Sequence, residues 1–447
     1  MYLTFETGIG SVTGANFLVE TKEKKFLVDC GMIQGDHETE KQNRIPFSYT
    51  PADIDYLFVT HAHLDHVGRI GKLVKDGFHG EIYSTPETFA LAQLVMTDAV
   101  GILGLEAKKE NIQPLYESQH TEKAFTLWKT IPYHVNTDIG DFSLYLKDAG
   151  HILGSSIMEF TIEGKEIVFT GDLGNSPTPL LRDTESIEGA EYMIMESVYG
   201  DRNHEPKDER DAKFEKIVTE TIAKGGTLVI PSFSLERTQV ILYELNNIAE
   251  KGKLNVPVFV DSPLATKVTD IYRESTELFN EGIKKQIAEG DDVFDFKKLK
   301  FTVNHEESNA LDRMHGPKII LAGSGMSMGG RVRHHEASYL PNPNNTILLV
   351  GYQPLGTLGR NLQDAKNSVT IDKQKIKVEA KIETIFGYSS HKDSDHLVEF
   401  VSHGKASLKK VFPVMGEPKS SLFLAQRIKD ELGIDAMYPE KGKRYEL

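Results

Sequence analysis

Short apolar runs alternate with turn residues through the first part of the chain. The runs fall between Gly, Asn and Asp positions, and this spacing favours a layered β structure with helices on the outside. Thr85 and Pro86 are typical of a helix start, an N-cap followed by proline at the first helical position, and they predict a helix over 87–101. The strands expected here are 16–19, 25–28, 56–59, 142–146, 157–162 and 166–170.

The pattern changes after a charged, apolar-poor segment at residues 202–213, which we interpret as a domain boundary. Beyond it, near-continuous apolar runs are interleaved with helical patterns such as 235–249, and they predict a parallel sheet covered on both faces. The apolar runs are 227–231, 258–260, 318–321 and 346–350. After Ile371 the alternating pattern returns at 376–385 and 410–414, before a final helix around 422–432.

The α/β unit is therefore predicted to be an insertion. The expected boundaries are 1–205 and 374–447 for the first domain and 206–373 for the inserted domain. A length of 447 residues agrees with two domains, or with one domain that carries a large insertion.

Composition limits the environment and the partners. A net charge of −15 argues against a broad basic face for nucleic acid, although it leaves room for a narrow cleft. We find no stretch long and apolar enough to cross a bilayer and no signal peptide, so no membrane partner is expected. The single cysteine, Cys30, excludes an internal disulfide and favours a cytoplasmic location. We expect Cys30 to be a small buried hydrophobe.

The most informative segment is His61-Ala62-His63-Leu64-Asp65-His66, just after the apolar run 56–59. Alternation at a strand end would send His61 and His63 to one side, and the following turn lets Asp65 and His66 face a second position. Imidazole and carboxylate are ligands of Zn²⁺ and similar cations. The segment predicts a site for two metals, the arrangement that hydrolyses phosphate esters and acyl bonds. Chance clustering and helix capping are the alternatives, and the full string is more specific than either.

Three further residues fit such a site. His151 lies in a loop between two glycines, where it would supply a third imidazole. Asp172 follows the strand 167–170, also between glycines, and its two oxygens can bridge two cations; the alternative is an Asx turn. Asp29 follows the strand 26–28 and is expected to orient a ligand imidazole.

These residues together resemble the metallo-β-lactamase superfamily. Asp29 matches its first motif, residues 61–66 the second, His151 the third and Asp172 the fourth. Residues 196–202 resemble motif A of the β-CASP group of RNA- and DNA-processing nucleases. Ser389-Ser390-His391-Lys392-Asp393 resembles motif B of that group, and 231–234, 261–263, 323–326 and 351–353 resemble landmarks of its inserted domain. The chain is most similar to bacterial and archaeal relatives of the pre-mRNA 3′-end endonuclease of the polyadenylation machinery.

The resemblance implies an α/β chain with a four-layer αββα fold interrupted by an α/β cap domain, and two Zn²⁺ per chain. A hydroxide held between the metals would attack phosphorus. His391, oriented by Glu196, would protonate the leaving 3′ oxygen. The implied metal ligands are His61, His63, Asp65, His66, His151 and Asp172, and the implied catalytic residues are Asp65, Asp172, Glu196 and His391. Arg237, Ser324, Gly325 and Ser390 are candidates to hold substrate phosphates, and each could equally be a turn or a structural cap.

One position departs from the pattern. The family's motif C usually reads Val-His-Gly-Glu, whereas this chain has Val414-Met415-Gly416-Glu417. A thioether is a poor partner for Zn²⁺ beside hard carboxylates, so the second metal is expected to bind more weakly, or turnover to fall. Glu417 moving into the gap is the alternative.

The resulting hypothesis is a metal-dependent ribonuclease that cuts single-stranded RNA. Endonuclease action and 5′→3′ exonuclease action use the same residues, so both stay open. The expected partner is single-stranded RNA, with a homodimer as an open alternative. The competing hypothesis is a catalytically impaired RNA-binding member of the same family, because of Met415. A small-molecule hydrolase would leave the inserted domain and Glu196 with His391 unexplained, and a flavin di-iron enzyme normally has Glu where His63 stands.

Overall fold

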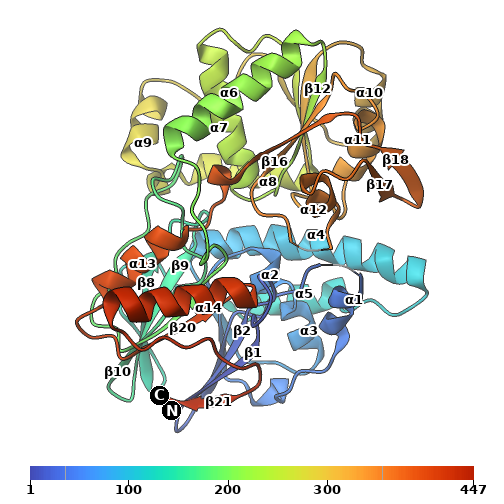
Figure 1. Cartoon of the computed structure of the whole chain (residues 1–447). Helices are drawn as coiled ribbons and strands as arrows, with labels where there is room; N and C mark the ends of the chain where they lie inside the picture. The colour runs from blue at the N-terminus through green and yellow to red at the C-terminus, as the bar shows by residue number, and fades with distance from the viewer. Residues whose placement is uncertain (36, 355) are drawn as a thin grey trace. The chain divides into compact units, whose positions relative to one another are not determined.

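A computed structural model describes residues 1–35, 37–354 and 356–447 (Figure 1). The chain forms two compact units, one of Met1–Asn203 with His391–Leu447 and one of His204–Ser390. The first boundary lies within two residues of the predicted one. The second predicted boundary, 374, differs from the division of the structure, because strand β19 (Lys381–Ile385) pairs in parallel with β16 (Thr346–Val350) of the inserted sheet. Its alternating sequence resembles a strand of the first unit, but its hydrogen bonds belong to the second.

The first unit contains a seven-stranded and a six-stranded sheet. The seven-stranded sheet has the order β21-β1-β2-β3-β4-β5-β6, and the six-stranded sheet has the order β20-β11-β10-β9-β8-β7. Each strand predicted for this part of the chain is present to within two residues. The bounds are β1 Tyr2–Thr7, β2 Asn16–Glu20, β3 Lys25–Val28, β4 Tyr56–Phe58, β5 Glu81–Ser84, β6 Trp128–Thr130, β7 Thr137–Ile139, β8 Phe142–Asp148, β9 Ser156–Ile162, β10 Lys165–Phe169, β11 Tyr192–Glu196, β20 Lys410–Val414 and β21 Arg444–Glu446.

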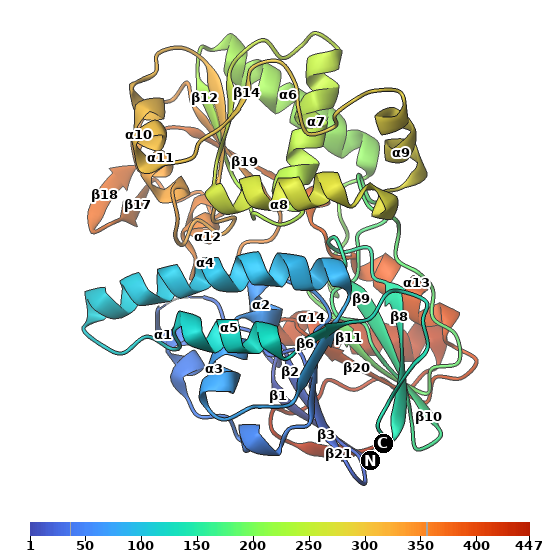
Figure 2. The same cartoon turned by 180° about the vertical axis from the view of Figure 1, so that it is seen from behind.

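An apolar core joins the inner faces of these two sheets. Phe26 of β3 contacts Phe160 of β9 with ring centroids 5.1 Å apart, and Phe5 of β1 contacts Phe412 of β20 at 5.4 Å. Helices α13 and α14 cover the outer face of the six-stranded sheet, and α3, α4 and α5 lie beyond the other sheet (Figure 2). The predicted αββα layering is confirmed. The helices are α1 His37–Glu40, α2 Leu64–Val67, α3 Ile70–Lys75, α4 Pro86–Glu110, α5 Ser118–Thr126, α13 Ser394–His403 and α14 Pro418–Arg427, which continues as a π turn to Leu432.

Helix α4 begins as predicted but ends nine residues later. Thr85 caps it by accepting a hydrogen bond from the Thr88 N–H at 3.2 Å, and Asn111 closes it with a left-handed φ of 55°. Gly101, where the prediction ended the helix, lies inside it. A second expectation also needs correction, since this one helix of the described chain is long and apolar enough to cross a membrane by length and composition. A core helix can meet the same test, so this is weak evidence for a membrane span.

The second unit is a six-stranded sheet of order β14-β13-β15-β12-β16-β19, and its neighbouring strands pair in parallel. The predicted parallel sheet is therefore confirmed. Its remaining strands are β12 Thr227–Pro231, β13 Val258–Asp261, β14 Leu299–Phe301 and β15 Lys318–Ala322, with a separate hairpin of β17 Ser368–Ile371 and β18 Gln374–Lys377. Its helices are α6 Lys207–Ala223, α7 Arg237–Glu250, α8 Pro263–Glu274, α9 Glu281–Ala288, α10 His305–Arg313, α11 Val332–Tyr339 and α12 Leu358–Gln363.

Candidate metal centre

The candidate residues lie at the carboxyl ends of parallel strands in the first unit. Strands β3 and β4 are parallel neighbours, and so are β10, β11 and β20. Because the carboxyl ends of parallel strands open on the same edge of a sheet, the loops that follow them come together. Asp29 follows β3, the 61–66 segment follows β4, Asp172 follows β10, Glu196 ends β11 and Met415 follows β20.

The sequence predicts that the histidine segment continues a strand, and this prediction is wrong. Strand β4 ends at Phe58, so His61 and His63 lie in a loop, and Asp65 and His66 lie on the short helix α2. Their positions follow from the path of this loop rather than from alternation along a strand.

Backbone hydrogen bonds hold helix α2 in place. Ala15 N–H donates to the Asp65 carbonyl, and Cys30 N–H donates to the His66 carbonyl, each at 2.9 Å. Only glycine fits at position 31, because a Cβ there would lie 1.4 Å from the Asp65 carbonyl oxygen. Cys30 is buried, and burial raises the pKa of its thiol to about 12, which agrees with its expected role as a small hydrophobe.

Asp172 lies at the centre of the imidazoles. Its Oδ2 is 3.5 Å from the Nε2 atoms of His61, His66 and His151. His63 Nδ1 lies 3.1 Å from the Nε2 atoms of both His61 and His151. These five side chains surround Asp172 Oδ2 or one another, although they come from three separate segments of the chain.

The distances fit a divalent cation. Donors on a tetrahedral zinc with bonds of about 2.1 Å lie about 3.4 Å apart, and the observed separations are 3.1 to 3.5 Å. Four donor atoms, from His61, His63, His151 and Asp172, lie within 4.8 Å of one another. Buried polar atoms rarely stay unpaired, yet His66 Nε2 and Asp172 Oδ1 have no hydrogen-bond partner among the described residues. The set is therefore suited to hold metal.

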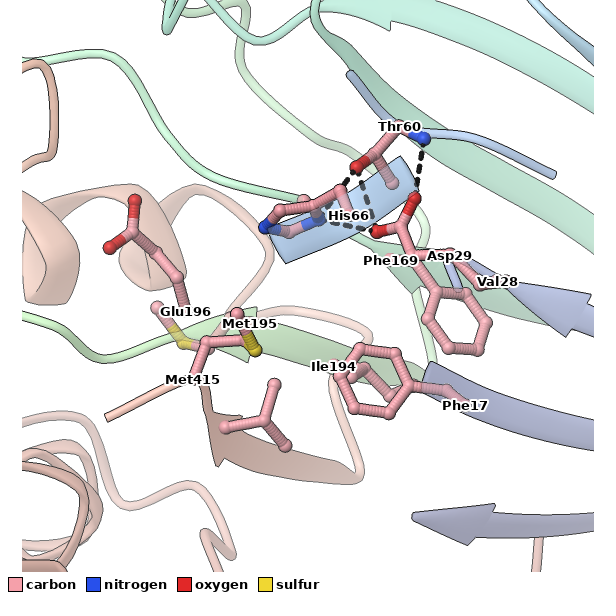
Figure 3. A pocket seen from close by; sticks show the side chains of 12 residues that line it. Phe17, Val28, Asp29, Thr60, His66, Phe169, Ile194, Met195, Glu196 and Met415 are labelled. Atoms are coloured by element: carbon pink, nitrogen blue, oxygen red, sulfur yellow. Dashed lines mark hydrogen bonds and ion pairs between the residues drawn. The ribbon is translucent and has the colours of Figure 1, made fainter. Parts of the chain in front are cut away.

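Asp29 orients His66. Its Oδ2 lies 2.7 Å from His66 Nδ1, and its two oxygens accept from the Thr60 N–H and hydroxyl at 2.8 Å (Figure 3). His66 therefore presents Nε2 toward Asp172 and Asp65, whose Oδ2 lies 3.9 Å away. Burial opposes a charged His66, but the carboxylates of Asp172, Asp29 and Asp65 outweigh it and raise its pKa well above the usual range. A cation at His66 must therefore displace a proton.

Glu196 and His391 form a second pair beside Asp172. His391 Nδ1 lies 3.1 Å from both carboxylate oxygens of Glu196 and 3.9 Å from Asp172 Oδ2. The Leu173 N–H donates to Glu196 at 2.6 Å, and Lys392 N–H donates to the Leu173 carbonyl at 2.9 Å. Burial opposes protonation of His391, but Glu196 raises its pKa to about 9.

The same pair offers a second reading that the sequence had not suggested. Donor atoms of Asp172, Glu196 and His391 lie within 4.8 Å of one another, so they too could hold a cation. Nothing in the local sequence signals this, since Glu196 and His391 are 195 residues apart.

Met415 occupies the edge of this site. Its side chain is 3% exposed, and its sulfur packs so closely on Gly8 that a Cβ there would lie 2.8 Å from it. A small cavity of about 10 Å³, enough for about one water molecule, is lined by Met415, His66 and Glu196 among others (Figure 3). Glu417, the alternative donor, is not among the described residues that line the cavity.

The four candidate phosphate-binding residues lie in the second unit. Arg237 donates to the Val350 carbonyl and, at 3.2 Å, to the Ser390 hydroxyl. The Ser324 hydroxyl accepts from the N–H groups of Met328 and Gly329 at 3.1 and 3.3 Å. The Gly325 carbonyl accepts from Gln353 at 3.0 Å. These bonds favour the structural alternative, and phosphate binding by these residues stays a prediction.

An αββα sandwich with a buried imidazole and carboxylate cluster at its strand ends defines a metal-dependent hydrolase. Three family matches cover successive parts of the chain. Residues 10–213 match the metallo-beta-lactamase superfamily, 238–362 the Beta-Casp domain, and 375–439 the Zn-dependent metallo-hydrolase RNA specificity domain.

Curated relatives agree with these matches. Ribonuclease TTHA0252 of Thermus thermophilus is 34% identical over 390 residues, which cover 87% of this chain and 88% of that protein. Transcription termination factor FttA of Methanosarcina mazei is 33% identical, and the alignment covers 96% of this chain and 69% of that protein. FttA of Pyrococcus horikoshii is 31% identical, and the alignment covers 97% of this chain and 69% of that protein. The chain belongs to the β-CASP group of the metallo-β-lactamase superfamily, as the sequence motifs predicted.

A solved structure supports the fold alone. A protein of unknown function from Enterococcus faecalis V583 covers 99% of both chains with a TM-score of 0.55 and 16% sequence identity. Family membership and the His/Asp cluster together support a metal-dependent hydrolase that acts on RNA.

Proposed function

We propose that the protein is a zinc-dependent ribonuclease that hydrolyses phosphodiester bonds of single-stranded RNA, as an endonuclease with 5′→3′ exonuclease action as a second mode. One observation carries the proposal: Asp172 Oδ2 lies within 3.9 Å of three imidazoles and of the His391 nitrogen that pairs with Glu196. A cytoplasmic location also stays a prediction, based on the single cysteine.

The chain offers two overlapping sets of ligands. His61, His63 and His151 would hold one cation, Asp65 and His66 the other, and Asp172 both. When bound, two such cations lower the pKa of water and offset the charge that develops on a phosphoryl oxygen.

His391 is suited to act as the general acid. Glu196 faces Nδ1 of His391, and Nε2 would carry the proton to the leaving oxygen. A pKa of about 9 keeps the imidazole protonated near neutral pH. The Leu173 N–H fixes Glu196, so the donor is held in place before substrate binds.

A second candidate is an RNA-binding protein with impaired catalysis. It is favoured by Met415, whose sulfur packs against Gly8 and adds no strong zinc donor to the cavity beside His66. The distances of 3.5 Å from Asp172 Oδ2 to His61, His66 and His151 support the active enzyme over this second candidate.

The test is cleavage of a circular and an end-labelled linear single-stranded RNA by zinc-loaded protein, with Asp172→Asn as the control for contaminating nuclease. Cutting of the circle by the wild type alone supports endonuclease action, because a circle has no ends. Loss of nucleotides from the 5′ end of the linear RNA alone supports exonuclease action. No cutting by folded protein with measured zinc, together with retained RNA binding, supports the impaired candidate.

A further inference from the structure

The β17–β18 hairpin of the second unit carries a row of lysines. It lies at one edge of this unit, separate from the six-stranded sheet (Figure 1). Lys375 and Lys377 occupy alternate exposed positions of β18, and alternate side chains on a strand point to the same face. Lys373 is exposed in the turn that precedes β18. Thr370 and Ser368 of β17 lie directly opposite Lys375 and Lys377 and add hydroxyl groups to that face.

The opposite face of the hairpin is packed. Val369 and Ile371 are 5% and 2% exposed and belong to the apolar core of the unit, with Ile376 packed against them. The lysine face is therefore held on a folded support rather than on a loose loop. Lys375 and Lys377 are two positions apart on β18, so their Cα atoms lie about 6.8 Å apart along the strand.

The tip of the hairpin breaks a local rule. Asp372 and Lys373 form a two-residue turn with φ values of 47° and 67°. Such turns favour Asn followed by Gly, because both central residues need a positive φ. A lysine at the second position is disfavoured by roughly 1 kcal/mol, and no contact in the described structure compensates for it. Such a departure from local preference points to a function for the side chain.

Two of the three lysines of the hairpin have no ion pair within the described residues. Arg333 pairs with Asp372 at 3.0 Å, and Lys377 pairs with Glu379. Lys373 and Lys375 have neither an ion pair nor a side-chain hydrogen bond within residues 1–35, 37–354 and 356–447. In a chain with a net charge of −15, these two lysines are a local basic feature on the exposed face of the hairpin.

We propose that the lysine face, defined as Ser368, Thr370, Lys373, Lys375 and Lys377, binds the phosphate backbone of RNA. The inference rests on the proposed function and names a surface through which the substrate strand is held. Ammonium and hydroxyl groups contact phosphates without reading bases, so the contribution to affinity is independent of sequence and weakened by salt.

The experiment measures binding of a fluorescent single-stranded RNA across a series of salt concentrations. The Asp172→Asn background prevents cutting during the measurement. Adding K373A and K375A is expected to weaken binding about five- to twentyfold at 0.1 M salt and to reduce the salt slope by about 0.7 for each lost contact. The matched control is K108A with K109A at the end of α4, which removes the same charge from the first unit.

A third variant separates charge from folding. K373G suits the positive φ of the turn, so it is expected to leave the thermal midpoint unchanged or higher while it weakens RNA binding. Weaker binding with an intact midpoint supports the proposal. The proposal is overturned if K373A/K375A binds RNA as tightly as the protein that keeps both lysines, or if its affinity falls no further than that of the K108A/K109A control.

Hydrolysis of a small chromogenic phosphodiester distinguishes RNA binding by the hairpin from the hydrolase activity of the first unit. The hairpin variants, made without Asp172→Asn, are expected to hydrolyse this short substrate as the wild type does. If the wild type hydrolyses it but the hairpin variants bind RNA normally, the hairpin proposal alone fails. If the wild type neither hydrolyses it nor binds RNA, the proposed function fails as well.

Discussion

Two buried clusters of histidine and aspartate, one in each unit, differ in how completely their polar atoms are paired. In the second unit, Asp261 accepts from His335 at 2.6 Å, Arg331 at 2.6 Å, Ser308 at 2.5 Å and Thr302. The other nitrogen of His335 faces Asp312 at 3.3 Å. In the first unit, by contrast, His66 Nε2 and Asp172 Oδ1 have no hydrogen-bond partner in the described structure.

The difference separates a structural network from a binding site. The Asp261 cluster satisfies its own charges, since each carboxylate oxygen has a donor, and it joins β13 to α11. The Asp172 cluster instead brings imidazole nitrogens and carboxylate oxygens together, and two of these atoms have no hydrogen-bond partner in the described structure. Composition is similar in both, so the pairing pattern, rather than the presence of His and Asp, indicates function.

The largest effect is expected from Asp172→Asn. Removing the carboxylate that faces three imidazoles should lower RNA cleavage by about 10³-fold or more, because Asp172 would contribute to both of the proposed metal positions. The measurements are the single-turnover cleavage rate and the zinc content per chain. The free energy of unfolding of the zinc-free protein should change less than in the Asp261 variant below; a larger loss would mean that this cluster is structural too.

Asp261→Asn should act on stability instead. The substitution removes the carboxylate that pairs with the buried His335 and the partly buried Arg331, so the free energy of unfolding should fall by about 3–5 kcal/mol. Zinc content should stay the same in the folded fraction. The matched control is Asp270→Asn, an exposed partner of Arg273 in the same unit, which should change stability by less than about 1 kcal/mol. Loss of zinc from folded Asp261→Asn protein would remove the distinction between the clusters.

Glu196→Gln is expected to lower cleavage by about 10²-fold, because it weakens the orientation and charge of the general acid. Glu196 raises the pKa of His391, and the acid is active while protonated, so activity is lost as pH rises through that pKa. Without the carboxylate the pKa falls, and the alkaline limb of the pH–rate profile should move to lower pH. An alkaline limb that does not move would assign that limb to another group.

The smallest effect is expected from Met415→His. Residue 415 has a φ of 50°, a conformation that histidine tolerates better than most residues, and it lines the cavity beside His66. The new imidazole should raise affinity for the second zinc by about tenfold or more, measured as zinc bound per chain during titration. Met415→Leu fills the same space without a donor and should leave zinc binding unchanged. If neither variant alters zinc binding, residue 415 does not set the affinity of the proposed second site.

Much of this fold could be predicted locally. Apolar runs such as 16–19 and 346–350 became strands because their pattern is read within a few residues, and Thr85 with Pro86 located the start of α4. The end of α4 could not be predicted, because Gly101 inside a long helix looks like a helix end. The sequence pattern placed β19 in the first unit, whereas β19 pairs with β16 of the second. An alternating pattern predicts a strand but not the strand with which it pairs.

The sequence by itself determined the donor types and their places after strands, because residues 61–66, His151 and Asp172 can be read without any contact. Only the tertiary structure decided which atoms meet. In the structure, His391 lies beside Glu196 although the two are 195 residues apart, and the Met415 sulfur packs against Gly8. Ser324 and Arg237 form hydrogen bonds within their own unit. The physical reason is that distances between loops depend on sheet order and packing, which join segments far apart in the chain.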